Sequence, residues 1–323
     1  MKSLLLAAVC VSVLVSAGGL QAEDPAPKAI PVSQSEKDPR KIERLQVFLD
    51  REGFPPGQID GKWGEFTGKA LARYQQHRQG QPPGTAIDMP SDFSTHTGYT
   101  VTEDNLKQVG EVGETPEEKS KQKTMPYPTM VHLIKERFHC DGDYLKSLNP
   151  GVNMDELNAG DRLKVPNVTP FEVEKLKVKD RVQPKAQFKS RKLLIDTGEK
   201  MLDVMEGEKV VGSFPITPGS ESLPAPVGTW KIETMTQLPV FRWDESMLKK
   251  GVRSDDFHII PPGPSSPVGV MWMALSKQGI GIHGTNNSET IGRAASHGCI
   301  RLANWDAIRL SEMVTDGVIV EIR

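Results

Sequence analysis

Two helical stripes of apolar residues lie between residues 40 and 80 of the chain. In each stripe the apolar positions recur three and four residues apart, which is the spacing of one face of an α-helix. The segment between the stripes, Gly53 to Asp60, contains two glycines and two prolines and predicts a loop. The pattern therefore predicts a small unit of two helices joined by a loop. The apolar positions are Leu45, Phe48 and Leu49, then Ala70, Leu71 and Tyr74.

A second unit is predicted between residues 126 and 170. Two further helical stripes are followed by the turn 149–151, with the sequence Asn-Pro-Gly. After it, Leu163 and Val165 alternate with polar residues, as in a short strand with one buried face. The helical positions are Met130, Leu133, Ile134 and Phe138, then Tyr144, Leu145 and Leu148.

Two stretches lack such periodicity. Residues 23–39 are rich in proline, serine and charged side chains, which predicts a linker. Residues 81–125 contain several prolines and a run of mixed charge. Their length fits either a linker or an ordered extension that lies over a neighbouring unit, and the sequence leaves both open.

From residue 189 to residue 323 the period changes to that of strands. Residues 192–196 and 201–205 flank a Thr-Gly-Glu-Lys turn and predict a hairpin, and further strand-like runs follow. A helix is expected near the end of the chain, at 305–314. The long stretch 239–269 is expected to be a loop that walls a substrate groove. The whole chain is therefore predicted to be an α+β protein of several domains.

The first 22 residues have the pattern of a secretory signal. Lys2 precedes an apolar run from Leu4 to Val15, and small residues lead up to Glu23. The apolar run is too short to span a membrane, and cleavage after Ala22 is expected. The mature protein is therefore expected to be exported, with no membrane partner. The 40 basic and 42 acidic residues nearly cancel, so no nucleic-acid partner is expected either.

The stretch from Ile280 to Leu302 has the composition of a thiol active site, with Cys299, His283, His297 and several glycines. A cysteine attacks a carbonyl as its thiolate, so it needs a base nearby and donors for the developing oxyanion. Glycine lets the backbone come close to a substrate, which makes the amides of Gly298 and Cys299 the candidate oxyanion hole. The spacing alone does not decide which histidine is the base.

Three other features of this chemistry follow from the residues. Arg301 comes two positions after Cys299 and should share its face, where its guanidinium could hold a peptide carboxylate or form a structural ion pair. A disulfide between Cys140 and Cys299 would silence the nucleophile, so both are expected to be thiols, with a structural role for Cys140. No cofactor and no metal site are expected, because the chain has no Cys-x-x-Cys and no His-x-x-x-His spacing.

The sequence His-Gly-Thr-Asn, followed after a short loop by Ser-His-Gly-Cys-Ile-Arg-Leu, resembles the catalytic motif of the L,D-transpeptidases of bacterial cell walls, the YkuD-type family. The resemblance implies that His283 is the base and that the carbonyl of Gly284 orients its imidazole. It assigns a supporting role to His297 and adds Ser296 and Asn286 to Arg301 as candidate substrate-binding residues. It also implies that residues 189–323 form a mostly antiparallel β-sandwich with one helix.

The two smaller units resemble modules of wall enzymes. Residues 40–80 carry Asp60-Gly61, Trp63 and Thr67, and so resemble a peptidoglycan-binding domain. Residues 126–170, with two helices, an Asn-Pro turn and the run Gly160-Asp161 before a strand, resemble a LysM module. For each unit, a structural role without a ligand stays open.

The resemblance implies an L,D-transpeptidase that forms 3→3 crosslinks between peptidoglycan stem peptides through a cysteine thioester, in the periplasm or cell wall. The partners expected are stem peptides and glycan, with a wall-linked protein as a possible acceptor. Four alternatives stay open: an L,D-carboxypeptidase, an enzyme that anchors proteins to the wall, a non-catalytic wall-binding protein, and a generic cysteine protease.

Overall fold

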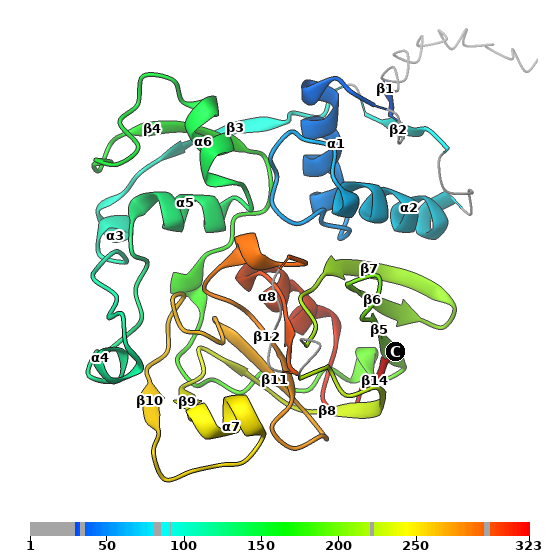
Figure 1. The fold of residues 1–323 in the computed structure, drawn as a ribbon. Helices are drawn as coiled ribbons and strands as arrows, with labels where there is room; N and C mark the ends of the chain where they lie inside the picture. Colours follow the sequence, from blue (N-terminus) through cyan, green and yellow to red (C-terminus); the bar gives the residue numbers. More distant parts are fainter. Residues whose placement is uncertain (1–29, 33–35, 80–84, 91, 220–222, 294–297) are drawn as a thin grey trace, which may run out of the picture.

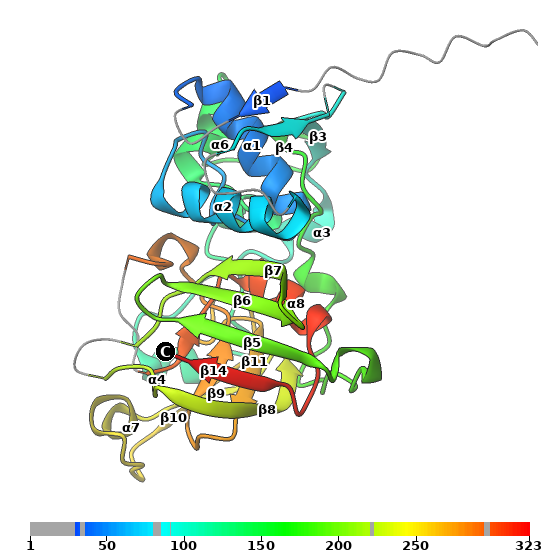
Figure 2. The same cartoon turned by 90° about the vertical axis from the view of Figure 1, so that its right-hand side faces the viewer.

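The computed structural model describes residues 30–32, 36–79, 85–90, 92–219, 223–293 and 298–323. Two mainly helical units lie on one side of the molecule, and a sheet domain lies on the other (Figures 1 and 2). The predicted signal segment, 1–22, and most of the predicted linker, 23–39, lie outside the described residues. Within the described ranges, no helix has both the length and the apolar character that crossing a membrane requires.

Helices α1 (Pro39–Arg51) and α2 (Glu65–Gln79) form the first unit, as the two apolar stripes predict. Asp38 caps α1 by accepting from the amide of Arg40. The loop between the helices is held by Gln46, whose side-chain oxygen accepts from the amides of Asp60 and Gly61. Those two residues therefore shape the loop from within. The short strands β1 (Ile30–Val32) and β2 (Ile87–Met89) pair beside this unit.

The second unit combines two helices with a pair of strands. Helices α5 (Met130–Arg137) and α6 (Gly142–Leu148) precede β4 (Arg162–Pro166), in the order that the sequence predicts. The partner of β4 is β3 (His96–Thr100), which pairs with it in antiparallel register and comes from far upstream. The stretch 81–125, for which the sequence leaves a linker or an ordered extension open, contains β2, β3 and two short helices. These helices are α3 (Glu103–Leu106) and α4 (Pro116–Ser120).

Eight strands of the C-terminal domain form one sheet in the order β13-β12-β11-β8-β14-β5-β6-β7. Most pairs are antiparallel, whereas β12 with β13 and β14 with β5 are parallel. Helix α8 (Asn304–Met313) packs against the sheet. The strands are β5 (Arg191–Asp196), β6 (Met201–Glu206), β7 (Lys209–Pro215), β8 (Gly228–Gln237), β11 (Met271–Leu275), β12 (Gly281–His283), β13 (Ile300–Arg301) and β14 (Ile319–Ile322).

The α+β class and the mostly antiparallel pairing agree with the sequence prediction, whereas the predicted sandwich does not: these eight strands form one curled, mixed sheet. The long strand β8 explains the difference. Its residues 228–231 pair with β14, while its residues 232–237 pair with β11. Because its two halves serve different neighbours, the sheet bends along β8 and encloses its own core (Figure 2). Short 3₁₀ turns occur at Val173–Lys175, Ala186–Phe188 and Ser288–Thr290.

The long stretch 239–269 is an arm with structure of its own. Strands β9 (Phe241–Trp243) and β10 (His258–Ile260) pair in antiparallel register, and α7 (Glu245–Lys250) lies between them. Asp244 holds the arm together by accepting from the amides of Met247 and Ser254, at 3.0 and 2.8 Å. These hydrogen bonds, the one from Ser254 foremost, lower the pKa of Asp244 to about 2.

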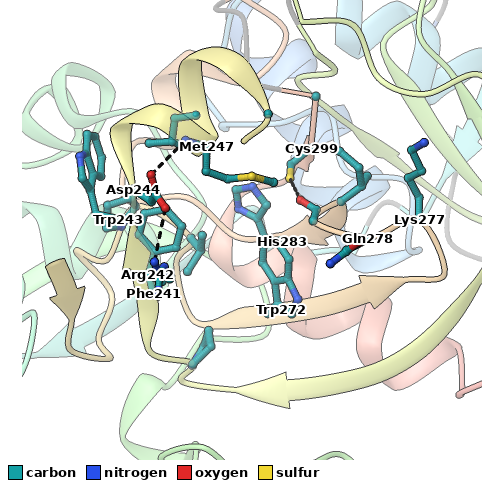
Figure 3. Close-up of a pocket in the computed structure, with 18 of the residues that line it drawn as sticks. Phe241, Arg242, Trp243, Asp244, Met247, Trp272, Lys277, Gln278, His283 and Cys299 are labelled. Carbon is teal, nitrogen blue, oxygen red and sulfur yellow. Dashed lines mark hydrogen bonds and ion pairs between the residues drawn. The ribbon is translucent and has the colours of Figure 1, made fainter. Parts of the chain in front are cut away.

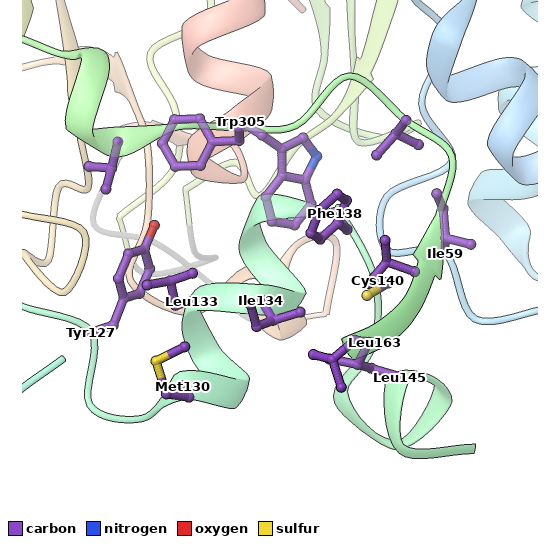
Figure 4. Packing of buried hydrophobic residues seen from close by; sticks show 14 of the residues in the cluster. Ile59, Tyr127, Met130, Leu133, Ile134, Phe138, Cys140, Leu145, Leu163 and Trp305 are labelled. Atoms are coloured by element: carbon purple, nitrogen blue, oxygen red, sulfur yellow. The ribbon is translucent and has the colours of Figure 1, made fainter. Parts of the chain in front are cut away.

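A shared core joins the two helical units to the sheet domain. Trp305 of α8 is buried beside Phe138 and the α5 residues Leu133 and Ile134 (Figure 4). Its indole also stacks on the ring of His139, with centroids 5.1 Å apart. A single cluster therefore spans all three parts of the chain, which makes their docking part of the folded core rather than a surface contact.

A buried ion pair crosses the same junction. Asp50 of α1 is fully buried and accepts two hydrogen bonds from Arg309 of α8, at 2.7 and 3.0 Å. Nδ1 of His139 lies 3.0 Å from Oδ2 of the same carboxylate. Burial acts against the charge of Asp50, but Arg309 and His139 outweigh it and hold the pKa of that carboxyl well below its usual range.

The buried carboxyl of Asp306 should make the free energy of unfolding depend on pH. Burial raises its pKa to about 8, so the folded protein holds a proton that the unfolded chain releases near pH 4. The free energy of unfolding should therefore fall as the pH rises from about 4 to about 8, by at most about 1.4 kcal/mol per pH unit for this group. The Asp306→Asn variant has no titratable group at this position, so its free energy of unfolding should fall less over that range. Urea unfolding of both proteins at several pH values measures the difference, and parallel curves would contradict the prediction.

Candidate active site

A row of side chains crosses four neighbouring strands of the curled sheet. Trp272 of β11 is paired with Thr236 of β8 on one side and with His283 of β12 on the other. His283 is in turn paired with Arg301 of β13. Residues opposite each other in a sheet project to the same face. All four line one cavity of about 1060 Å³, which Cys299 also lines.

The orientation of His283 is set by its own neighbour. The side chain is only 5% exposed, and its Nδ1 lies 2.6 Å from the carbonyl oxygen of Gly284. A carbonyl only accepts, so Nδ1 carries the proton and Nε2 is left as the basic nitrogen. The ring also stacks on Trp272, with centroids 5.3 Å apart and planes 19° apart. The carbonyl of Gly284 and the indole of Trp272 therefore fix the orientation of the imidazole.

Burial keeps His283 neutral. It lowers the pKa of the imidazole to about 4; the hydrogen bond to Gly284 opposes this shift and the charge of Arg301 adds to it. A neutral imidazole at neutral pH can accept a proton. Figure 3 shows its ring at the same end of the cavity as the sulfur of Cys299.

Cys299 is partly exposed in the cavity, and its Sγ lies 3.8 Å from the carbonyl oxygen of Gly279. Burial raises the pKa of the thiol, although Arg301 and a backbone hydrogen bond act in the opposite direction. The resting group is therefore a thiol that needs a base to become a nucleophile. Gly298, just before it, has φ +92°, a conformation that a side chain would strain.

The other candidate residues divide into three groups. Arg301 is partly buried in the cavity, and no ion pair with it occurs among the residues that the structure describes. Asn286 is exposed and lines a second, smaller cavity of about 190 Å³ between α5 and the loop after His283, away from the large cavity. Ser296 and His297 lie outside the described residues.

The large cavity is strongly basic. Five basic residues and one acidic residue, Asp244, are among its described lining residues. Asp244 accepts from the amides of its own arm and also forms an ion pair with Arg242 at 3.5 Å, so the basic residues exceed the acidic ones by four. Such a lining attracts a substrate that carries carboxylates. The basic residues come from four separate segments, so no local pattern in the sequence could reveal them. They are Lys179, Arg242, Arg253, Lys277 and Arg301.

Met247 of α7 reaches across the cavity towards Cys299 (Figure 3). A Cβ added to Gly279 would lie 2.7 Å from the Met247 methyl group, so this side chain packs directly on the residue whose carbonyl contacts the thiol. Met247 therefore lies next to the thiol of Cys299, where it restricts access to a sulfur that is only partly exposed. Sequence periodicity predicts the arm only as a loop and does not indicate this residue.

Shortening this side chain should expose the thiol. We expect Met247→Ala to raise the rate of Cys299 alkylation by iodoacetamide about fivefold, which corresponds to about 1 kcal/mol less steric cost. Leu248→Ala, one position along the same helix, serves as the matched comparison. Equal alkylation rates in wild type and Met247→Ala would contradict this restriction of access.

Comparisons with known proteins find sequence relatives of the sheet domain. Residues 190–322 match the family profile of the L,D-transpeptidase catalytic domain, YkuD. The YkuD protein of Bacillus licheniformis, whose name marks it provisionally as an L,D-transpeptidase, is 28% identical over 194 residues, which cover 59% of this chain and 92% of that protein. The YkuD protein of Bacillus subtilis, named in the same way, is 33% identical over 132 residues, which cover 40% of this chain and 64% of that protein.

A solved structure, that of the catalytic domain of an Enterococcus faecium L,D-transpeptidase, shares 19% identity with this chain. It covers 43% of this chain and all of its own length, with a TM-score of 0.31. The sequence matches, rather than this distant structural likeness, connect the sheet domain to the L,D-transpeptidases.

Proposed function

We propose that this protein is an L,D-transpeptidase of the cell wall, which transfers peptidoglycan stem peptides through a thioester on Cys299. One observation carries the proposal: a thiol and an oriented, neutral imidazole, His283, share a basic cavity. Acyl transfer through cysteine requires that combination. The matched region, 190–322, contains both residues.

In the first half-reaction, His283 Nε2 takes the proton of the Cys299 thiol as the sulfur attacks the carbonyl carbon of the third residue in a donor stem. Backbone amides at Gly298 and Cys299 stabilise the oxyanion. The bond to the fourth residue breaks, and the imidazolium gives its proton to the leaving amine. The product is a thioester between the donor stem and Cys299.

In the second half-reaction, an amine of a neighbouring stem attacks the thioester carbonyl. His283 takes a proton from this amine and returns it to the sulfur as the carbon–sulfur bond breaks. The new amide is a 3→3 crosslink. Water in place of the amine would make the reaction a carboxypeptidase cleavage, and a protein amine would make it an anchoring reaction.

Within this proposal, the two N-terminal units bind the enzyme to the glycan of peptidoglycan. The first unit offers a shallow cavity of about 530 Å³, in which the half-buried Trp63 could stack on a sugar ring. For the second unit, the proposal of a LysM-like module is supported by the pairing of β3 with β4 next to the helices α5 and α6. Both units are proposed as glycan-binding modules of a protein in the periplasm or wall.

The proposal is tested by intact-protein mass spectrometry of the mature chain after incubation with a carbapenem, and then with purified disaccharide tetrapeptides. We expect one antibiotic adduct per chain on Cys299, and a crosslinked dimer from the peptides. Tripeptide products without dimers would indicate the carboxypeptidase. A reduced Cys299 that captures neither reagent would contradict the proposed function.

Arg301 is proposed to bind a carboxylate of the donor stem. Replacing it with glutamine removes a charged hydrogen bond worth about 1.5–3 kcal/mol, so kcat/KM for a tetrapeptide donor should fall roughly 10- to 100-fold. The matched control is Lys250→Gln, an exposed basic residue at the end of α7 that is not among the lining residues of the cavity, and it should change kcat/KM little. With a donor whose carboxylates are amidated, Arg301→Gln and wild type should have the same kcat/KM. A lower kcat/KM of the variant with this donor would contradict the proposed contact between Arg301 and a carboxylate.

A further inference from the structure

A buried carboxyl group outside the cavity contacts the sheet domain. Glu136 lies on α5, in the second helical unit, and is only 7% exposed. Its Oε1 accepts from the hydroxyl of Tyr127 at 2.9 Å and from Nδ2 of Asn304 at 3.1 Å. Burial raises the pKa of Glu136 to about 7, against the opposing effect of these two hydrogen bonds. The proposed chemistry makes no use of this group.

Asn304 connects Glu136 to the active-site backbone. It is fully buried at the start of α8, where its Nδ2 also donates to the carbonyl of Pro264 and its Oδ1 accepts from the amide of Val270. A Cβ added to Gly284 would lie 2.2 Å from Asn304 Oδ1. The side-chain amide of Asn304 therefore sits directly against the backbone of Gly284.

Gly284 is the residue whose carbonyl accepts from His283 Nδ1 at 2.6 Å. Its amide donates to Met271 of β11 at 3.1 Å, so its backbone is held on one side by the sheet and on the other by Asn304. A continuous series of contacts thus leads from α5 through Asn304 and Gly284 to the proposed base. A second contact from α5 reaches the same loop, since Lys135 forms an ion pair with Glu289.

We propose, on the basis of the function proposed above, that Glu136 is a positioning residue for the base: it holds Asn304 against Gly284, and Gly284 holds the imidazole of His283 in line with Cys299. The second helical unit therefore completes the active site of the sheet domain. Loss of this contact lets the base turn away, and misplacement by about 1 Å can cost about 100-fold in rate.

The test uses the full chain and three variants. Glu136→Gln keeps an oxygen that can accept from Asn304, and it should acylate within about twofold of wild type. Glu136→Leu removes that oxygen, and the limiting rate of carbapenem acylation should fall about 10- to 100-fold, with no change in the carbapenem concentration that gives half of this rate. Tyr127→Phe, the matched control, removes the other hydrogen bond to the same oxygen and should acylate like wild type.

A second measurement observes the base directly. In protein labelled with ¹⁵N, the Nδ1–H group of His283 should give one signal typical of a hydrogen-bonded proton, both in wild type and in Glu136→Gln. In Glu136→Leu this signal should shift or broaden. If Glu136→Leu does not fold, Glu136→Asp, which withdraws the carboxyl group by one methylene, should show the same changes in rate and signal.

An unchanged rate and an unchanged His283 signal in folded Glu136→Leu would overturn the proposal, as would an equal loss of rate in Tyr127→Phe. If wild type forms no adduct, the proposed function fails, and the NMR signal alone then decides whether Glu136 positions His283.

Discussion

Replacing Cys299 with alanine is expected to abolish both the carbapenem adduct and the crosslinked product. The sulfur is the atom that forms the thioester, and the methyl group of alanine is no nucleophile. In enzymes that act through a covalent intermediate, loss of the nucleophile costs about 10⁶-fold in kcat. Intact-protein mass spectrometry and product analysis measure the two losses.

The chain provides a matched control in Cys140. This thiol is fully buried in the core that joins the helical units to the sheet domain, and burial raises its pKa well above the usual range. Cys140→Ala should therefore keep the adduct, although it loses some packing. An adduct that persists in Cys299→Ala, or one that disappears in Cys140→Ala, would place the nucleophile elsewhere.

The second large effect is expected from His283→Ala. Without the imidazole, the thiol of Cys299, whose pKa is raised by burial, has to ionise unaided before it attacks. General-base catalysis contributes about 10²- to 10⁴-fold, so the acylation rate at neutral pH should fall by that factor. Stopped-flow measurement of carbapenem acylation gives the rate.

The pH profile separates loss of a base from loss of structure. In wild type, protonation of His283 should lower the rate only below about pH 5, because burial lowers its pKa to about 4. In His283→Ala the rate should instead rise steadily as the pH approaches the pKa of the thiol. A flat profile in the variant would contradict the role of base. His297→Ala tests the competing assignment and is expected to cost far less.

The two helical stripes of the first unit show which parts of the fold a local sequence pattern can predict. Leu45, Leu49 and Leu71 are fully buried in the structure, because an apolar residue at helical spacing has to face a core wherever that core lies. The same reasoning predicts α5 and α6. It does not predict β3, since a short strand such as His96–Thr100 acquires its burial only from its partner, β4.

The sequence by itself determined the chemistry proposed for the site. The residues themselves indicate Cys299 and the glycine before it, whereas the choice of His283 as base and the role of the Gly284 carbonyl come from the family resemblance of the motif. In the structure, Nδ1 of His283 lies 2.6 Å from that carbonyl oxygen. Hydrophobic period also predicted the helices α1, α2, α5 and α6 and the strands β4, β5 and β6.

Only the tertiary structure decided which segments meet. It placed Trp272 and Thr236 in one row with His283, curled the sheet along β8 in place of a sandwich, and brought Glu136 to Asn304. The physical reason is that a hydrophobic pattern specifies burial and not the partner: strand register, helix docking and buried hydrogen bonds depend on groups far apart in the chain.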